Sequence, residues 1–288
     1  MKYKYYKLYI QIAIIIYLII INKKIYLEEI IINNNNRLLD NYIYSFNNNE
    51  SLISIKKLKK VVYSVILGNY DEIKPINLQE GYDYFLFSDV YNNSFIKTNW
   101  TILQIPEEVK NLNISNVKKQ RYLKLHPHLF FHNYDFSIYL DAIYAIEGDL
   151  NEFLLRILSP KYYIYSLEHP ERNNIFQETF AVVQCKKEKY SMSERIRKRY
   201  KLENFTDNTG LIESCLIIRK YNEKSCIDLM NNWFKEIKNY SYRDQLSFNY
   251  ILWKNKYKIK YIVKNFALQY FPLKGYHRKV LDLNEVNK

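Results

Sequence analysis

Apolar positions change their spacing several times along the chain, and each change predicts a different element. Short runs rich in β-branched and aromatic residues predict strands, while apolar residues three and four apart predict helices. The predicted strands cover residues 61–67, 84–88, 137–140, 162–169, 216–219 and 256–263. The predicted helices cover residues 116–125, 151–158, 191–202, 222–237 and 243–254. Because strands and helices alternate, the pattern indicates a layered α/β domain.

The N-terminus carries the longest apolar run, Leu8 to Ile21, with lysines on both sides. It is shorter than the roughly 18–20 residues that span a bilayer comfortably, but terminal tyrosines and snorkelling lysines extend its reach. No small-residue cleavage site follows it. We expect residues 1–24 to form a single-pass, uncleaved membrane anchor, with a buried helix as the alternative. Lysines at both ends leave open which side of the membrane the remainder occupies.

Two asparagine-rich tracts follow the apolar run, INNNNR (Ile32–Arg37) and FNNNES (Phe46–Ser51). Polar low-complexity tracts resist forming a core. The sequence therefore predicts a polar stalk over residues 25–57 and one folded domain over residues 58–288.

Three predicted strands end on polar residues. Gly68 to Asp71 follow the first strand, Asp89 follows the second, and Asp141 ends the stretch FSIYLD. A carboxylate left near a core costs several kcal/mol unless it is paired. Asp141 is therefore either solvated at a strand end or paired with a metal ion or ligand. In open α/β sheets ligands bind beyond the carboxyl ends of the strands, so these residues predict one shared crevice.

Composition indicates which kinds of partner the protein is expected to bind. The net charge of +13 over 288 residues favours anionic partners such as nucleotide phosphates, acidic glycans or lipid head groups. The three cysteines show neither metal-ligand spacing nor a disulfide framework. The basic run Lys186–Lys201 has no nucleic-acid-binding signature, so no nucleic acid is expected as a partner. The three histidines between residues 126 and 132 predict a polar surface turn, and the alternative is that they bind zinc.

Six segments in order carry a resemblance to a known family. They are VVYSVILGNYDEIKP, GYDYFLFSD, RYLKLHPHLFFHNYDFSIYLDAIYAIEGDL, EHPERNNIFQE, GLIESCLIIRKYN and YRDQLSFNYILWK. Over about residues 60 to 255 the chain resembles the glycosyltransferase-like family named after plant mucilage and turgor proteins. The resemblance implies a single GT-A-type layered domain with a mixed central sheet, preceded here by the N-terminal hydrophobic helix. It also implies an enzyme that uses a nucleotide-sugar donor.

The resemblance gives Asp141 a role as a metal ligand. In GT-A enzymes a strand ends in an Asp-x-Asp-like element that holds a divalent metal, usually manganese, against the donor diphosphate. Asp oxygens suit hard cations, and the metal neutralises charge on the departing nucleotide. Ile143 stands where the second acid would be. A distant residue, a cationic side chain or a weakened site would account for this departure. His277 is the predicted second ligand, although it lies beyond the matched span.

Six residues are predicted to bind the donor. Tyr70 would stack on the base, Asp89 would contact base or ribose, and two cations on one helical face would pair with the diphosphate. The alternative for Gly68 to Tyr70 is a tight turn and for Asp89 an ordinary strand end. The alternative for Arg121 and Lys124 is a solvated helix face. The predicted donor residues are Gly68, Asn69, Tyr70, Asp89, Arg121 and Lys124.

The remaining candidates concern the acceptor. Glu213 and Asp244 are the candidate bases for the acceptor hydroxyl, which must lose its proton in the transfer. Glu213 could instead pair with a buried arginine. Asp244 could instead lie in the first turn of a helix because the helix dipole stabilises a negative charge there. The predicted acceptor or phosphate-facing residues are His169, Arg172, Glu178, Arg243 and Gln245.

The function expected from these residues is transfer of a sugar from a nucleotide-sugar donor to a glycan, lipid or protein acceptor. Because the second acid of the metal motif is missing, the alternative is a catalytically inactive module that binds nucleotide or glycan. A lipid-amide hydrolase is a further alternative.

Overall fold

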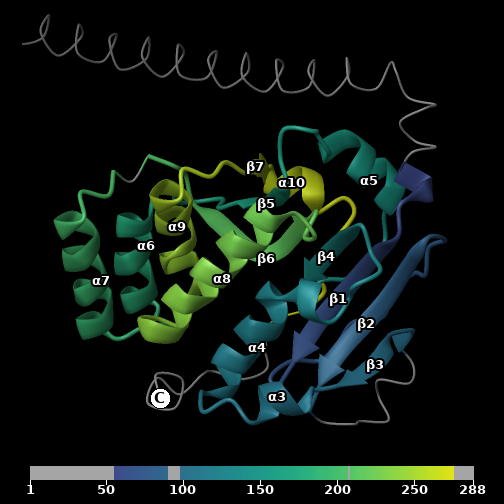
Figure 1. Ribbon diagram of the computed structural model, residues 1–288, viewed down its shortest axis with the longest axis horizontal. Helices are drawn as coiled ribbons and strands as arrows, with labels where there is room; N and C mark the ends of the chain where they lie inside the picture. The colour runs from purple at the N-terminus through teal and green to yellow at the C-terminus, as the bar shows by residue number, and fades with distance from the viewer. Residues whose placement is uncertain (1–54, 90–97, 207, 276–288) are drawn as a thin grey trace, which may run out of the picture. The chain divides into compact units, whose positions relative to one another are not determined.

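A computed structural model describes residues 55–89, 98–206 and 208–275 of the 288-residue chain. These residues contain a seven-stranded sheet with the strand order β3-β2-β1-β4-β6-β5-β7 (Figure 1). The strands are β1 (Lys60–Ile66), β2 (Tyr82–Ser88), β3 (Thr101–Gln104), β4 (Phe136–Leu140), β5 (Ile164–Glu168), β6 (Ile212–Arg219) and β7 (Lys260–Ile262).

The sheet is mixed, as predicted. Strand β1 pairs in parallel with both β2 and β4, and β2 pairs in parallel with β3. Strand β6 lies between β4 and β5 and is antiparallel to both, while β7 is parallel to β5. The carboxyl ends of β1, β2, β4 and β5 therefore point to one edge of the sheet, and the amino end of β6 lies at that same edge.

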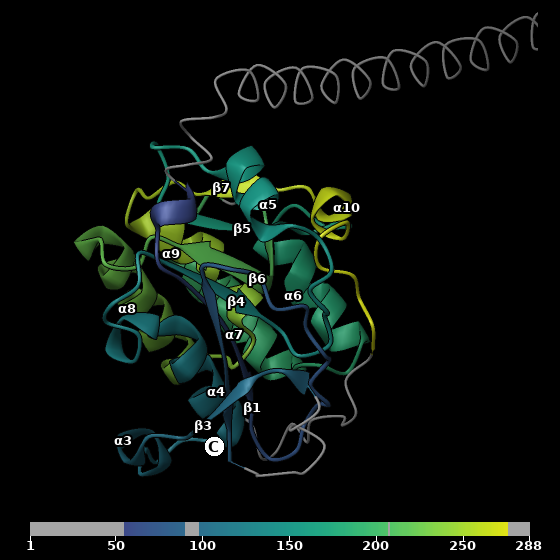
Figure 2. The ribbon, with the colours of Figure 1, turned by 90° about the vertical axis from the view of Figure 1, so that its right-hand side faces the viewer.

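Helices cover both faces of the sheet, which makes three layers. On one face α4, α6, α7, α8 and α9 share a core with β1, β4 and β6, and on the other face α5 and α10 do so (Figures 1 and 2). The helices are α3 (Glu107–Lys110), α4 (Asn116–Leu125), α5 (Leu150–Ile157), α6 (Ile175–Gln184), α7 (Tyr190–Leu202), α8 (Lys224–Asn239), α9 (Phe248–Lys254) and α10 (Lys264–Ala267). Two short 3-10 turns are η2 (Pro127–Leu129) and η3 (Asp244–Leu246).

Strand β1 shows why the sheet is buried on both faces. Tyr63 belongs to the core under α4 and α8, whereas Val62 and Ile66 belong to the core under α5 and α10. All seven residues of the strand are buried. A central parallel strand covered on both sides reads as a nearly continuous apolar run, and this is the pattern by which the strand was predicted.

Several helix boundaries follow from local chemistry. Asp149 caps α5, since its carboxylate accepts hydrogen bonds from the backbone N–H groups of Asn151 and Glu152. Helix α4 ends at Leu125, two residues before Pro127, because proline disfavours a helical residue directly before it. The predicted helix over 243–254 is wrong in one respect, because Ser247 separates η3 from α9.

The histidine segment after α4 also differs from its prediction. His126 was expected on a polar surface turn, but only 4% of it is exposed. Its ring stacks on Tyr122, with ring centroids 4.3 Å apart, and its Nδ1–H donates to the Tyr122 carbonyl over 2.7 Å. The residue belongs to the interface between α4 and α8, since it also meets the Phe234 ring edge to face.

The expected anchor and nearly all of the expected stalk lie outside the described residues. Within the part of the chain that the structure describes, none of the helices is long and apolar enough to span a membrane. The anchor over residues 1–24 therefore stays a prediction.

Candidate functional site

The carboxyl edge of the sheet gathers most of the predicted residues. Gly68 follows β1, Asp89 follows β2 and Asp141 follows β4, so all three lie at the same edge. Because β6 runs the other way, its first residues come to this edge as well: the Asp141 N–H donates to the Cys215 carbonyl over 2.9 Å. The crevice predicted from three strand ends thus receives a fourth contribution from the start of β6.

The loop after β1 is held by the end of β2. The Gly68 N–H donates to both carboxylate oxygens of Asp89, each at 2.9 Å. Gly68 and Asn69 have φ angles of 63° and 53°, a left-handed pair that glycine and asparagine tolerate better than other residues. The predicted donor residues Gly68, Asn69 and Asp89 are therefore brought together, with Asp89 bonded to the loop backbone.

Tyr70 follows this left-handed pair and is partly buried. Burial raises the pKa of its hydroxyl, and Asp71 adds to the shift, while the charges of Arg121 and Arg243 act in the opposite direction. The phenol therefore shares its surroundings with cations from α4 and from the segment before η3.

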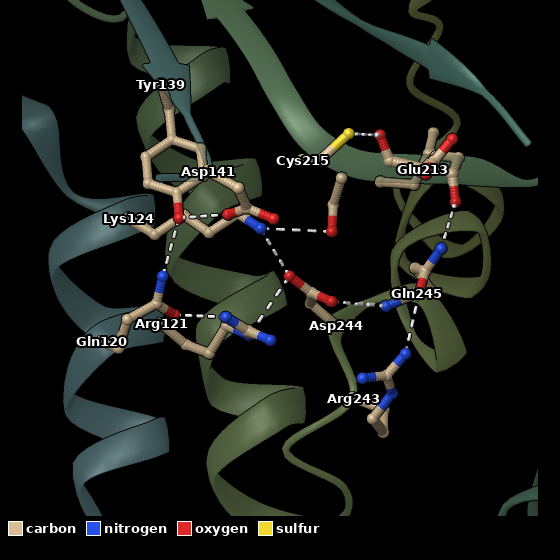
Figure 3. Close-up of polar contacts among 12 residues, drawn as sticks. Gln120, Arg121, Lys124, Tyr139, Asp141, Glu213, Cys215, Arg243, Asp244 and Gln245 are labelled. Atoms are coloured by element: carbon tan, nitrogen blue, oxygen red, sulfur yellow. Dashed lines mark hydrogen bonds and ion pairs between the residues drawn. The ribbon is translucent and has the colours of Figure 1, made fainter. Parts of the chain in front are cut away.

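Asp244 forms the most buried ion pair of the site. Its carboxylate lies 2.8 Å from Lys124 Nζ and 3.2 Å from Arg121 Nε, and both cations come from one face of α4 (Figure 3). The side chains of Asp244 and Lys124 are only 3% and 1% exposed. The alternative of a solvated helix face is therefore wrong for Lys124.

Burial alone would raise the pKa of the Asp244 carboxyl. The charges of Arg121 and Lys124 outweigh that effect and hold the pKa well below its usual value. Asp244 is consequently ionised, and its carboxylate is paired with the two cations. It is therefore better suited to holding those cations in place than to exchanging a proton.

Asp141 is positioned by the strand residue two places before it. The Tyr139 hydroxyl donates to the Asp141 carboxylate over 2.5 Å and accepts from the Gln120 side chain over 2.7 Å. The Lys124 ammonium lies over the Tyr139 ring, 4.8 Å from its centroid. Figure 3 shows Asp141 and Asp244 on either side of Lys124. Asp141 therefore ends its strand as part of a polar network.

The carbonyl of Lys124 is itself held from the sheet. It accepts hydrogen bonds from the Tyr63 hydroxyl at 2.5 Å and from Arg219 Nη1 at 2.9 Å. Arg219 is fully buried, with no exposed surface. This fixes the end of α4 and hence the position from which Lys124 reaches Asp244.

Glu213 lies near the start of β6 and therefore at the carboxyl edge of the sheet. Its carboxylate oxygens lie 2.7 Å and 2.9 Å from the Lys264 ammonium, and about a fifth of its side chain is exposed. The alternative partner considered for Glu213, a buried arginine, is replaced by Lys264 of α10, whose side chain is 24% exposed. Next to it Cys215 is buried, which raises the pKa of its thiol and leaves that thiol unreactive.

Arg243 and Gln245 flank Asp244. Gln245 donates to the Ile212 carbonyl over 3.2 Å and accepts from Arg243 Nη2 over 3.2 Å. Across residues 55–89, 98–206 and 208–275 Arg243 forms no ion pair. The site thus contains one guanidinium whose charge is not locally compensated by a contacting carboxylate.

His169, Arg172 and Glu178 form a network after β5. Arg172 Nε donates to the Glu178 carboxylate over 2.5 Å, and the backbone N–H of Arg172 donates to His169 Nδ1 over 3.1 Å. Burial lowers the pKa of His169, and Glu178 opposes that shift. The charge of Glu213 also reaches His169. The structure brings the predicted trio together beside the edge, with Glu178 buried in the first turn of α6.

Three residues of the site were missed from the sequence: Gln120, Tyr139 and Lys264. Tyr139 could have been found, since residues two apart on a strand share a face and it precedes Asp141 by two. Lys264 could not, because the contact between α10 and β6 joins residues 51 apart.

The described residues do not by themselves make a metal site. Among them, no three His, Cys, Asp or Glu side chains gather so as to hold a metal ion. Asp141 is followed at the second position by the apolar Ile143, and the other predicted ligand, His277, lies outside the described residues. Of the two predicted ligands, the described residues therefore supply Asp141 alone.

A three-layer α/β fold with charged residues at the carboxyl edge of a mixed sheet defines a class of ligand-binding α/β proteins. The chain belongs to the TOD1/MUCI70 glycosyltransferase-like domain family, whose model matches residues 44–277. This confirms the family expected from the six sequence segments. No curated protein sequence matches the chain significantly.

Several solved structures are similar to this chain at low sequence identity. The WbbM bifunctional glycosyltransferase is 15% identical, with 72% of this chain and 39% of that chain covered and a TM-score of 0.44. The galactosyltransferase LgtC with donor and acceptor sugar analogues is 12% identical, with 70% and 72% covered and a TM-score of 0.37. Mouse xyloside xylosyltransferase 1 is 8% identical, with 69% and 84% covered and a TM-score of 0.41.

Proposed function

We propose that this protein transfers a sugar from a nucleotide-sugar donor to a glycan, lipid or protein acceptor at the carboxyl edge of its sheet. The observation that carries the proposal is the convergence of Arg121, Arg243 and Asp141 on that edge, in a chain of a glycosyltransferase-like family. Ligands of open α/β sheets bind at this place.

The donor would bind between the loop after β1 and the cations of α4 and of the segment before η3. Tyr70 offers a ring for the base, and Asp89 holds the loop that carries it. Arg243 has a guanidinium suited to bidentate contact with a diphosphate. Lys124 is committed to Asp244 and positions its neighbours rather than touching phosphate.

The acceptor proton needs a base with access to solvent. Asp244 is buried and its pKa is depressed, so it is a weak base. Glu213 is partly exposed at the same edge, and we assign it the proton. In this scheme the acceptor oxygen bonds to the anomeric carbon, the bond from that carbon to the phosphate oxygen breaks, and the proton passes to Glu213. The nucleoside diphosphate leaves with the bond electrons.

No step of this scheme is routed through a metal ion, because the described residues do not supply a ligand set for one. Chemically, a cation at Asp141 would add positive charge beside the leaving diphosphate. Nucleotide binding that requires manganese would place that cation at Asp141.

One observation favours a second candidate, a catalytically inactive nucleotide-binding module. Ile143 occupies the place of the second acid in the family motif. Such a module would bind nucleotide with the same cations but would show no turnover. The amide hydrolase alternative has no comparable observation in its favour among the described residues.

The test is calorimetric titration of the full-length protein with nucleoside diphosphates, with and without manganese. Binding in the presence of manganese that weakens at least tenfold in Asp141→Ala, but not in the exposed control Asp228→Ala, supports a donor site with a metal at Asp141, and binding that is the same with and without manganese supports a donor site built from cationic side chains. Turnover of a nucleotide sugar that falls in Glu213→Gln at unchanged nucleotide affinity supports the catalytic assignment. Binding without any turnover favours the inactive module. A folded protein that binds no nucleotide under either condition overturns the proposal.

A further inference from the structure

Helices α6 and α7 carry exposed apolar side chains that the candidate site does not use. The described residues include seven exposed large hydrophobic side chains, and three of these lie on this pair of helices. They are Phe180, Tyr190 and Leu202, which are 56%, 60% and 83% exposed. The two helices pack against each other and lie side by side (Figures 1 and 2). Exposed large apolar side chains on neighbouring helices are one mark of an interaction surface.

Helix α7 and the linker that joins it to α6 are strongly basic. Residues 175–206 contain eight lysines and arginines but four glutamates. Glu178 and Glu188 are buried, Glu194 is paired with Lys198, and Glu203 is paired with Arg199 and Lys254. The exposed charge of this segment is therefore positive. We call the surface formed by Phe180, Tyr190, Arg195, Arg197, Lys198, Lys201 and Leu202 the basic–aromatic face.

Arg197 holds the two rings of this face in place. Its guanidinium lies 4.3 Å from the Phe180 ring centroid and 5.7 Å from the Tyr190 centroid, and its Nη1 donates to Thr179 Oγ1 over 3.2 Å. Both rings remain more than half exposed in this arrangement. The cation thus organises the rings at the surface and does not bury them.

We propose that the basic–aromatic face docks on the surface of an anionic lipid bilayer. A soluble polyanion would engage the cations alone, whereas a bilayer surface offers anionic head groups beside an apolar phase for Phe180, Tyr190 and Leu202. Long basic side chains and aromatic rings together are typical of helices that lie in the membrane interface. Juxtaposed lysines and arginines add attraction to anionic lipid. This docking is independent of the sugar-transfer proposal.

The chain contains a natural reporter for the docking. Cys185 directly follows α6 and is exposed, whereas Cys215 and Cys226, its other cysteines, are buried. A polarity-sensitive fluorophore will therefore attach to Cys185 in the folded full-length protein. Its emission reports on this face even if another part of the chain also binds lipid.

The experiment mixes the labelled protein with vesicles of phosphatidylcholine alone or with 30% phosphatidylserine, a fraction of roughly the order that gives a strongly negative surface. We expect a blue shift only with the anionic vesicles. The variant Arg195→Gln/Lys198→Gln/Lys201→Gln should raise the lipid concentration for half-maximal shift by about 100-fold, since each cation contributes roughly fivefold. Leu202→Ser should reduce the shift at saturating lipid.

The matched control is Lys57→Gln/Lys161→Gln/Lys224→Gln, which removes the same charge outside α6 and α7 and, like the test variant, includes one helical ion pair. The control should behave as wild type. An unchanged shift in the test variant overturns the proposal, as does a shift of equal size with neutral vesicles. A soluble anionic oligosaccharide that competes fully, with Leu202→Ser behaving as wild type, would instead identify a glycan surface.

Discussion

Asp244 shows how one carboxylate can organise a site without reacting in it. It lies between two α4 cations, is almost completely buried, and has a pKa held far below normal. The charges of Arg121, Lys124 and Arg243 all act on this one carboxylate. The residue therefore sets the local charge and the positions of its partners.

Replacing Asp244 by Asn should destabilise the fold strongly. Breaking a buried pair leaves charges uncompensated and costs about 3–5 kcal/mol. The exposed pair of Asp228 with Lys224 provides the control, because exposed pairs contribute about 0–1 kcal/mol. Urea unfolding of Asp244→Asn and Asp228→Asn measures both losses. Similar losses in the two variants would contradict the central role of Asp244.

Arg243 should matter for ligand binding rather than for stability, since it has no ion pair among the described residues. Arg243→Gln is expected to weaken nucleoside diphosphate binding by about tenfold, the typical effect of losing a hydrogen bond to a charged group. The measurement is calorimetric titration at two salt concentrations. The variant should also show a shallower salt dependence, because one screened charge is gone. Unchanged affinity would remove Arg243 from the donor site.

At the scale of elements, Gly148 marks a close approach of two segments. A Cβ on Gly148 would lie 2.5 Å from Tyr270 Cδ1 and 2.7 Å from its Cα, closer than packed atoms allow. The Tyr270 carbonyl also accepts a hydrogen bond from the Gly148 N–H over 3.2 Å. The loop between β4 and α5 thus packs directly on the backbone after α10.

Gly148→Ala should destabilise the fold by about 1–3 kcal/mol, the usual cost of overpacking. Gly275→Ala is the control, because its new Cβ would meet only the flexible Lys74 side chain. That variant should stay within about 0.5 kcal/mol of wild type. Thermal unfolding compares them, and equal melting temperatures would show that the loop adjusts without strain.

The end of α4 should make stability depend on pH. Burial lowers the pKa of His126 to about 4, so the folded protein keeps it neutral while the unfolded chain protonates it near pH 6.5. The neutral His126 therefore makes its full contribution to the stability of the fold above pH 6.5, and this contribution is lost as the pH falls towards 4. The slope is about 1.4 kcal/mol per pH unit within that window.

His126→Asn should flatten this slope, whereas His132→Asn, at an exposed position, should keep it. His128 also has a pKa lowered by burial, so the comparison rests on the difference between variants at each pH. Guanidinium unfolding at pH 7.0, 6.0 and 5.0 measures it. A wild-type slope in His126→Asn would contradict the assignment.

Sequence patterns predicted the elements whose apolar spacing is regular. Residues 116–125 form α4 as expected, and β1 is displaced by one residue from its prediction. Strand β3 and helix α6 were not predicted. Strand β3 has four residues, none of them buried, so its spacing carries no core signal. Helix α6 begins in a polar stretch, where Asn174 caps it, and it resembles a loop until its partner α7 is known.

The residues of the candidate site also divide into those that the sequence predicted and those that it did not. Strand-end residues could be predicted because topology alone places them. The partners could not, because Asp244 meets Lys124 across 120 residues and Glu213 meets Lys264 across 51. His126 was misplaced for a related reason: a polar residue beside a proline is usually exposed, and only its packing against α8 shows that this one is buried.

At the scale of the whole molecule, the sheet has two halves joined at β4 and β6. The half with β1 to β4 is entirely parallel, and the half with β5 to β7 contains the reversed strand. The polar edge takes residues from both halves, so no half contains a complete site. The basic–aromatic face on α6 and α7, by contrast, belongs to one contiguous stretch of sequence.

The reversed strand β6 has a consequence for the order of events during translation. Domains are built from the N-terminus at a few residues per second. Strands β1 to β4 can pair while the ribosome still holds the second half of the chain. Glu213, Asp244 and Lys264 emerge only later, and until Asp244 arrives Lys124 has no counter-ion at its final position. The nascent chain therefore passes through a stage with half a sheet in which Arg121 and Lys124 still lack the carboxylate of Asp244.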